Sequence, residues 1–266
     1  MTGSGNDFVI VDGRSSSPDD WSGSDIQAVC ARGTGVGADG IVFLGPGSAP
    51  GAVRMVYFNS DGSRAALCGN AALCSTRLAA HLGLASSGGM QLETDAGTYE
   101  SRCSREDGRA ELRLAPVPPP AAVPALKLQH GEQQVAVSVV GVPHLIVLVD
   151  DVEHVDLAPR GKALRGDPVL GPEGANVNFV APGGGPSEWR IRSYERGVEG
   201  ETLACGTGAV ATACTLEHWN LANFPITLWT RSGRCLEVRG RRGESGRYED
   251  VWLLGEARIV LRGVLI

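Results

Sequence analysis

The sequence predicts an α+β protein built from two pseudosymmetric halves, and three features of its 266 residues indicate this. Short runs that are apolar or alternating, typical of β-strands, far outnumber the segments with helical character. A proline-rich stretch from Ala115 to Leu126 interrupts the chain near its middle, where it can continue neither a helix nor a strand ladder. The dipeptide Cys-Gly, at Cys68 and again at Cys205, opens the two longest helical segments. We therefore expect each half to contain several strands and one long helix.

The predicted strands fall on both sides of the proline-rich stretch. In order along the chain they are 8–13, 40–45, 53–59, 110–115, 135–141, 144–152, 176–181, 189–197, 226–230, 235–240 and 257–263. Long helices are expected over 69–82 and 206–219, where small and branched apolar residues follow the Cys-Gly pair. A shorter helix is expected over 24–32. Many strands around few helices are typical of the α+β class.

The proline-rich stretch also predicts a domain boundary. We expect a first domain over 1–115, joined by a C-terminal strand at 256–266, and a second domain over 116–255. Cys205 follows Cys68 by 137 residues (205 − 68), which is close to half of the chain. This spacing favours an internal duplication, in which each half brings the same element to a shared site.

Composition and charge exclude several classes of function. A net charge of −6 with scattered arginines leaves no basic surface for nucleic acid. The longest aliphatic run, Leu145 to Val149, is far too short to cross a bilayer, and the first residues have no signal-peptide pattern. Seven cysteines without paired CxxC spacing favour a reduced compartment over a disulfide scaffold or a zinc site. We expect a cytoplasmic protein without metal, nucleic-acid or membrane partners.

A cysteine placed directly before a helix indicates acid-base chemistry. The first N–H groups of a helix have no internal partners and carry partial positive charge, so we expect the pKa of a thiol there to be lowered. Glycine in the next position lets a carboxylate approach the backbone closely. Two such helix starts facing each other could take a proton from one side of an α-carbon and deliver one to the other.

Racemisation by such a pair needs no cofactor. The usual alternative is pyridoxal phosphate, which requires a Schiff-base lysine. The chain has only Lys127 and Lys162, and neither lies near a glycine-rich phosphate loop. The segment Gly35 to Gly40 formally fits G-x-G-x-x-G, but it runs into a predicted strand rather than a helix, which argues against a dinucleotide site. We therefore expect no cofactor.

Six blocks of sequence, in the same order over nearly the whole chain, carry a family resemblance. They are 3–13, 33–41, 57–74, 141–152, 174–180 and 194–209. Together they resemble the diaminopimelate epimerases. The resemblance implies two similar domains, each a mostly antiparallel sheet wrapped around a central helix, with an active site in the cleft between them. It also implies a cofactor-independent isomerase that interconverts LL- and meso-diaminopimelate in lysine biosynthesis, with a small-molecule amino-acid substrate and a homodimer as an oligomeric state to test.

The resemblance also implies roles for individual residues. Cys68 and Cys205 are the base and the acid, and they exchange roles with the direction of reaction. The helix-start residues that hold the reacting carboxylate are Gly69, Asn70, Gly206 and Thr207. Further substrate contacts fall on Asn6, Asn59, Asn176, Glu195 and Arg196. Arg196 suits a distal carboxylate, which a guanidinium binds through two parallel hydrogen bonds. His144 and Glu195 support the two thiols.

Three departures from the family pattern leave other functions open. Val142 stands where the family commonly has Asn, and Ala71 and Leu73 replace a usual Gly and Arg. They motivate a second hypothesis, a racemase or proton-shift isomerase of the same fold for another amino acid or a specialised-metabolism intermediate. A third hypothesis is a non-catalytic scaffold that uses the thiols as a redox or metal-binding pair. The remaining cysteines are expected to be structural.

Overall fold

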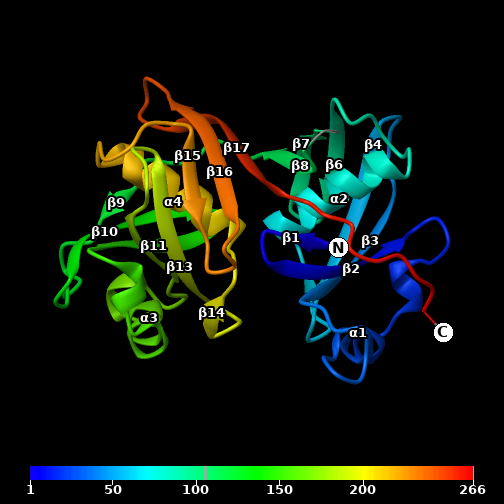
Figure 1. The fold of residues 1–266 in the computed structure, drawn as a ribbon, viewed down its shortest axis with the longest axis horizontal. Helices are drawn as coiled ribbons and strands as arrows, with labels where there is room; N and C mark the ends of the chain where they lie inside the picture. Colours follow the sequence, from blue (N-terminus) through cyan, green and yellow to red (C-terminus); the bar gives the residue numbers. More distant parts are fainter. Residues whose placement is uncertain (105–106, 266) are drawn as a thin grey trace. The chain divides into compact units, whose positions relative to one another are not determined.

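A computed structural model describes residues 1–104 and 107–265 and divides the chain into two compact units. Unit 1 consists of Met1–Arg113 and Leu254–Ile266, and unit 2 of Leu114–Leu253. Both crossings between the units lie two residues before the boundaries expected from the sequence. Figure 1 shows the helices and strands of both units, coloured along the sequence.

Unit 1 is a mostly antiparallel sheet with two α-helices. Its elements are β1 (Thr2–Gly3), β2 (Asn6–Asp12), η1 (Pro18–Asp20), α1 (Gly23–Cys30), β3 (Gly40–Pro46), β4 (Ala52–Asn59), β5 (Arg64–Ala65), α2 (Gly69–His81), β6 (Met90–Thr94), β7 (Gly97–Cys103) and β8 (Arg109–Arg113). The pairs β2–β3 and β4–β6 are parallel, and each is joined through a helix. The pairs β1–β2, β3–β4, β4–β5, β6–β7 and β7–β8 are antiparallel.

Unit 2 repeats this order of elements. They are β9 (Ala121–Ala122), β10 (Glu132–Val140), β11 (Val142–Val149), η2 (Val152–His154), α3 (Leu157–Arg165), η3 (Pro168–Leu170), β12 (Asn176–Pro182), β13 (Glu188–Glu195), β14 (Gly200–Thr202), α4 (Gly206–His218), β15 (Ile226–Trp229), β16 (Cys235–Arg242) and β17 (Tyr248–Glu256), whose last residues belong to unit 1. Here β11–β12 and β13–β15 are the parallel pairs joined through helices. The hairpin between them, β12–β13, matches β3–β4 of unit 1. The predicted fold of two pseudosymmetric α+β halves is confirmed.

The two long helices are the centres of their units. Helix α2 contacts strands from β1 to β8, and α4 contacts β10, β11, β12, β15 and β16 (Figure 1). Most residues of both helices are buried, as expected for a helix enclosed by a sheet rather than lying on its surface. Buried hydroxyls inside them bond to the carbonyl one turn back, as Ser75 does to Ala71 and Thr215 to Ala211. Each helix start is therefore held by the whole core of its unit.

Helix α1 begins where a capping box places it. Ser22 Oγ accepts from the Asp25 backbone N–H, and the Asp25 carboxylate accepts from the Ser22 N–H. The helix ends at Cys30, two residues earlier than expected. Ile26 and Cys30 pack into an apolar cluster with the core face of β3.

The structure also corrects several expectations. Helix α3 was not predicted because Pro159 and Gly161 interrupt its sequence; the proline sits in the first turn, where it costs no hydrogen bond. Strands β6, β7 and β17 were missed, and the first two are rich in polar residues. The strand expected over 257–263 is wrong: the segment makes a single bridge, from Arg258 to Thr2. An apolar run becomes a strand only where a neighbouring strand completes the ladder, and Val260 and Val264 lie exposed instead.

Gly161 should be required for the packing of α3. A β-carbon built there would lie 2.7 Å from the Cβ and 2.8 Å from ring atoms of Tyr194 on β13. We expect Gly161→Ala to destabilise the protein by about 1–3 kcal/mol through overpacking, despite the better helix propensity of alanine. Thermal and urea unfolding measure this. The control is Gly166→Ala at the end of the same helix, where nothing lies within 4 Å; equal stability of the two variants would contradict the argument.

Candidate functional site

Cys68 lies at the start of α2 in unit 1. It is the N-cap residue, with an extended backbone, and its side chain does not cap the helix. Tyr57 of β4 is almost fully buried and hydrogen-bonds to this thiol. Burial and the neighbouring sulfur raise the pKa of the Tyr57 hydroxyl. Gly40 admits the tyrosine ring, because a β-carbon there would lie 2.6 Å from Tyr57 Cε2. Tyr57 was not predicted as a site residue, since its contact with Cys68 depends on tertiary packing.

Two other predicted residues of unit 1 meet beside Cys68. Asn70, the second residue of α2, donates through Nδ2 to Asn6 Oδ1 at 2.6 Å. Asn6 in turn donates through Nδ2 to Asp39 Oδ2 at 2.8 Å. Asn59 is held differently: at the end of β4, its side chain donates to Ser63 Oγ in the following turn. The structure thus brings Asn6 and Asn70 together, whereas Asn59 bonds to its own turn.

Cys205 occupies the matching position at the start of α4 in unit 2. It is again an N-cap residue with extended backbone and no capping bond from its side chain. Thr207 Oγ1 lies 3.8 Å from the sulfur. Glu195, the last residue of β13, hydrogen-bonds to Cys205, and Thr202 donates its hydroxyl proton to Glu195 Oε1. Three predicted residues, Cys205, Thr207 and Glu195, therefore form one cluster.

The pKa of Cys205 departs from the expectation based on the helix start. Burial raises this pKa well above its ordinary value, and the Glu195 carboxylate raises it further. Hydrogen bonds from the Gly208 backbone N–H and the Thr207 hydroxyl lower it, as a helix start should, but they do not outweigh the loss of water. The expected lowering is wrong for Cys205, which is a protonated thiol near neutral pH. The pKa of Glu195 is also raised by burial, against hydrogen bonds from Thr202 and Cys205.

His144 is fully buried and connects to the start of α4 through Asn178. Burial, followed by the charge of Arg196, lowers the pKa of His144 to about 3, so the ring is neutral. His144 Nδ1 lies 3.2 Å from Asn178 Nδ2, and Ser193 Oγ donates to Asn178 Oδ1 at 2.8 Å. A β-carbon at Gly208 would collide with Asn178 Oδ1 and lie 3.1 Å from the Cys205 sulfur. Asn178 therefore lies between His144 and the start of α4, where Cys205 stands.

Asn178 was missed, although the sequence carried a signal for it. Asn176 and Asn178 are two residues apart on β12, and residues two apart on a strand face the same side. The predicted site residue Asn176 therefore pointed to Asn178 as well.

The predicted residue Arg196 is held by contacts to its backbone and its side chain. Asn176 Oδ1 accepts from the Arg196 backbone N–H at 2.7 Å. The Arg196 guanidinium pairs at 3.0 Å with Glu173, whose side chain is 81% exposed. An exposed pair of this kind contributes little stability, so Arg196 can exchange it for a carboxylate ligand.

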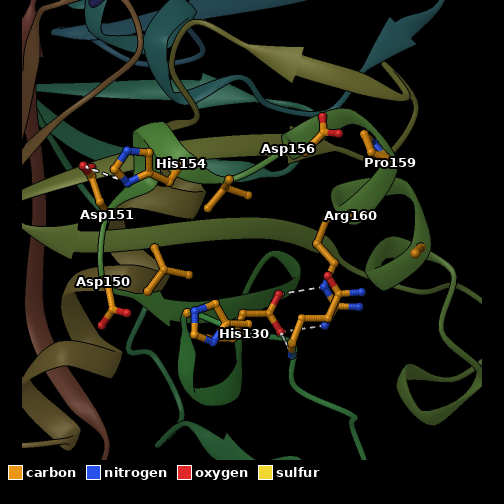
Figure 2. Close-up of a pocket in the computed structure, with 13 residues that line it drawn as sticks. His130, Asp150, Asp151, His154, Asp156, Pro159 and Arg160 are labelled. Carbon is orange, nitrogen blue, oxygen red and sulfur yellow. Dashed lines mark hydrogen bonds and ion pairs between the residues drawn. The ribbon is translucent and has the colours of Figure 1, made fainter.

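A pocket of unit 2 is lined by other residues. It has a volume of about 630 Å³, and none of the predicted site residues lines it. Figure 2 shows Arg160, which forms an ion pair at 2.6 Å with Glu132, and His154 turned toward Asp151. Asp151 also pairs with Arg190 at 3.0 Å. The carboxylates of Glu132, Asp150 and Asp151 thus have partners within the chain.

Residues 1–104 and 107–265 contain neither a metal-binding cluster nor a candidate membrane helix. No group of three or more His, Cys, Asp or Glu side chains there is arranged to hold a metal ion. Within the same residues, none of the helices has the length and apolar character needed to cross a membrane.

Comparison with known proteins places the chain in a family. The family model for diaminopimelate epimerase matches residues 1–116 and 136–243. The chain belongs to the diaminopimelate epimerase family. The resemblance carried by the six sequence blocks is confirmed, and the protein is an isomerase. A diaminopimelate epimerase from Gemmatimonas aurantiaca is 46% identical over 99% of this chain and 96% of its own. One from Aquifex aeolicus is 36% identical over 100% of this chain and 96% of its own.

Solved structures agree with the fold. A phenazine biosynthesis protein of the PhzF family from Bacillus anthracis has a TM-score of 0.72 at 14% identity, covering 96% of this chain and 92% of that protein. A protein from Pseudomonas aeruginosa described as a predicted epimerase has a TM-score of 0.68 at 20% identity, covering 100% and 94%. At such low sequence identity, these structures support only the assignment of the epimerase-like fold.

Proposed function

We propose that this isomerase interconverts LL- and meso-diaminopimelate by moving the α-proton between Cys68 and Cys205. The observation that carries the proposal is the matched start of α2 and α4. In each unit a cysteine is the N-cap of the buried central helix, its side chain is not used as a cap, and glycine follows. Two equivalent thiols at equivalent helix starts suit a reaction whose two directions are mirror images at one carbon.

The protonation of Cys205 suggests how a turnover begins. The thiol carries its proton because burial raises its pKa, so it is the donor in the direction for which Cys68 is the base. Cys68 takes the α-proton, electron density moves onto the substrate carboxylate, and the Cys205 proton is delivered to the opposite face. The roles are exchanged in the reverse direction. In this reverse direction Cys205 must first become a thiolate, and Glu195 can accept its proton through their hydrogen bond. Nothing in this scheme requires a cofactor.

The helix starts would bind the carboxylate as its charge increases. Backbone N–H groups of Gly69, Asn70, Gly206 and Thr207 lack helical partners because they lie in the first turns of α2 and α4. Donors placed where charge develops are typically the largest contribution to catalysis of this kind. His144, neutral and buried, would contribute as a hydrogen-bonding group rather than as an acid. Arg196 would take the distal carboxylate.

Two of the three departures from the family pattern lie in the core. Ala71 and Leu73 of α2 are fully buried, so they affect the packing of the helix within unit 1. Val142, the first residue of β11, is partly exposed and remains the position at which substrate choice can differ. This favours diaminopimelate over the alternative of another amino acid.

The test is proton exchange at the α-carbon. Reduced protein incubated with LL-diaminopimelate in D2O should produce the meso isomer with deuterium at the inverted carbon, seen by NMR and mass spectrometry. Absence of both deuterium and meso product would refute the proposal. Running the same assay with a panel of other amino acids separates diaminopimelate from the second hypothesis, because only the true substrate exchanges at a catalytic rate.

We also propose a reducing, cytoplasmic compartment for the enzyme. All seven cysteines are free thiols, and a reducing compartment keeps them so. The homodimer stays a prediction that sedimentation of the purified protein can check.

A further inference from the structure

Four side chains of unit 1 form a hydrogen-bonded series that ends beside Cys68. Arg32 Nη2 donates to Asp39 Oδ1 at 2.8 Å, and Asp39 Oδ2 accepts from Asn6 Nδ2 at 2.8 Å. Asn6 Oδ1 then accepts from Asn70 Nδ2 at 2.6 Å. The series joins the end of α1, the loop before β3, the start of β2 and the first turn of α2.

The charge at one end of this series determines the direction of every hydrogen bond in it. An ionised carboxylate only accepts, and Asp39 is paired with a guanidinium that only donates. Asn6 must therefore turn its NH2 group toward Asp39 and its oxygen toward Asn70. Asn70 must therefore donate to that oxygen through its own NH2 group. Without Asp39 an asparagine amide could lie either way, because its oxygen and nitrogen have nearly the same shape.

Both asparagines are residues for which the proposed function expects substrate contact. Asn70 follows Gly69 in the first turn of α2 and is almost fully buried. Gly3 packs against it, since a β-carbon at position 3 would lie 3.0 Å from the Asn70 carbonyl oxygen. The backbone position of Asn70 is thus set by packing, while the orientation of its amide is set by Asn6.

We propose that Asp39 and Arg32 are positioning residues of the isomerase, which fix the amide orientation of Asn6 and Asn70 without touching substrate. This inference rests on the proposed function. The Asp39 carboxylate selects the amide face that each asparagine presents, and the ion pair with Arg32 holds this carboxylate in place. Substrate binding should consequently depend on the charge of a residue outside the site.

The chain offers a matched control in Asp7. This carboxylate binds the same guanidinium, at 2.9 Å and 2.6 Å, and its side chain is 39% exposed against 36% for Asp39. It also accepts from the Asp39 backbone N–H at 3.1 Å. Asp7→Asn and Asp39→Asn therefore remove the same charge from the same ion-pair cluster, but only Asp39 holds Asn6.

The experiment compares these two isosteric variants with the wild type, using LL-diaminopimelate as the probe. We expect Asp39→Asn to raise KM about tenfold or more, since a hydrogen bond to a charged group is lost and an amide is free to turn. Asp7→Asn should stay close to wild type, and Asp39→Glu should recover part of the loss because it restores an acceptor. Thermal unfolding should shift by similar amounts in the two Asn variants. Equal KM values for Asp39→Asn and Asp7→Asn would overturn the inference.

A neutron structure of the wild-type protein tests the same inference without activity. Deuterium should be seen on the Asn6 atom that faces Asp39 and on the Asn70 atom that faces Asn6. The opposite orientation of either amide would overturn the inference, and this test remains available if Asp39→Asn does not fold. Lack of turnover by the wild type would count against the proposed function. The neutron map would still test the orientation of the two amides.

Discussion

Replacing Cys205 by alanine is expected to abolish inversion of the α-carbon, lowering the epimerisation rate by about 10³-fold or more. A positioned general acid contributes about 10²–10⁴-fold, and an alanine at this buried position has no proton to deliver. If Cys68 is the opposite base, the variant should still exchange the α-proton of the one stereoisomer whose proton faces Cys68. Deuterium incorporation without change of configuration, followed by NMR in D2O, is the measurement.

The control for this prediction lies in the same helix. Cys214 of α4 is fully buried, and burial raises its pKa as it does that of Cys205, but it lies nine residues further along the helix. Cys214→Ala should cost about 1 kcal/mol of stability through lost packing and leave the epimerisation rate close to wild type. Should Cys205→Ala and Cys214→Ala lose activity to the same extent, a specific role for the Cys205 thiol would be excluded.

The buried His144 is expected to make the protein steeply sensitive to acid. The unfolded chain binds a proton at this residue below pH 6.5, whereas the folded protein resists it down to about pH 3. Between these values the unfolded state holds more protons, so the free energy of unfolding falls as the pH falls, by up to about 1.4 kcal/mol per pH unit. The accumulated loss approaches about 5 kcal/mol near pH 3. Urea unfolding at intervals from pH 7 to pH 4 measures the slope.

His144→Gln isolates this contribution. The variant loses a packed ring and so starts from lower stability, but its stability should depend less on pH between pH 6.5 and pH 4 than that of the wild type. His154, whose side chain is 87% exposed, is the comparison, because His154→Gln should keep the wild-type slope. Parallel curves for His144→Gln and the wild type would show that His144 titrates normally in the folded protein.

Some elements of the fold follow directly from local sequence. The start of α2 after Cys68 and of α4 after Cys205 was expected and is observed to the residue. Glycine and small apolar residues there form a helix that can be buried on all sides, so the local pattern and the tertiary environment agree. Helix α3 shows the opposite case. Its glycine disfavours a helix locally, but Gly161 is what allows the helix to approach Tyr194.

Strands with apolar or regularly alternating residues were predicted close to their observed bounds. Strands β3, β11 and β12 are buried along nearly their whole length and were expected close to their observed bounds. Strands β6 and β7 expose alternate polar residues, and their pairing with each other and with β4 supplies the order that their composition does not. The segment 257–263 was wrongly expected to be a strand for the converse reason: its residues are apolar, but no neighbouring strand completes a ladder with it.

For the candidate site, local sequence determines which groups stand at the helix starts: a thiol, a glycine and the backbone N–H groups of the first turn. It does not determine their chemistry. The pKa of Cys205 is set by burial and by Glu195, ten residues away, and the environment of His144 by Asn178 of another strand. Likewise Tyr57 and Asp39 reach the surroundings of Cys68 through contacts between separate elements. Desolvation and hydrogen-bond direction depend on every neighbour in space, so these properties arise only when the chain has folded.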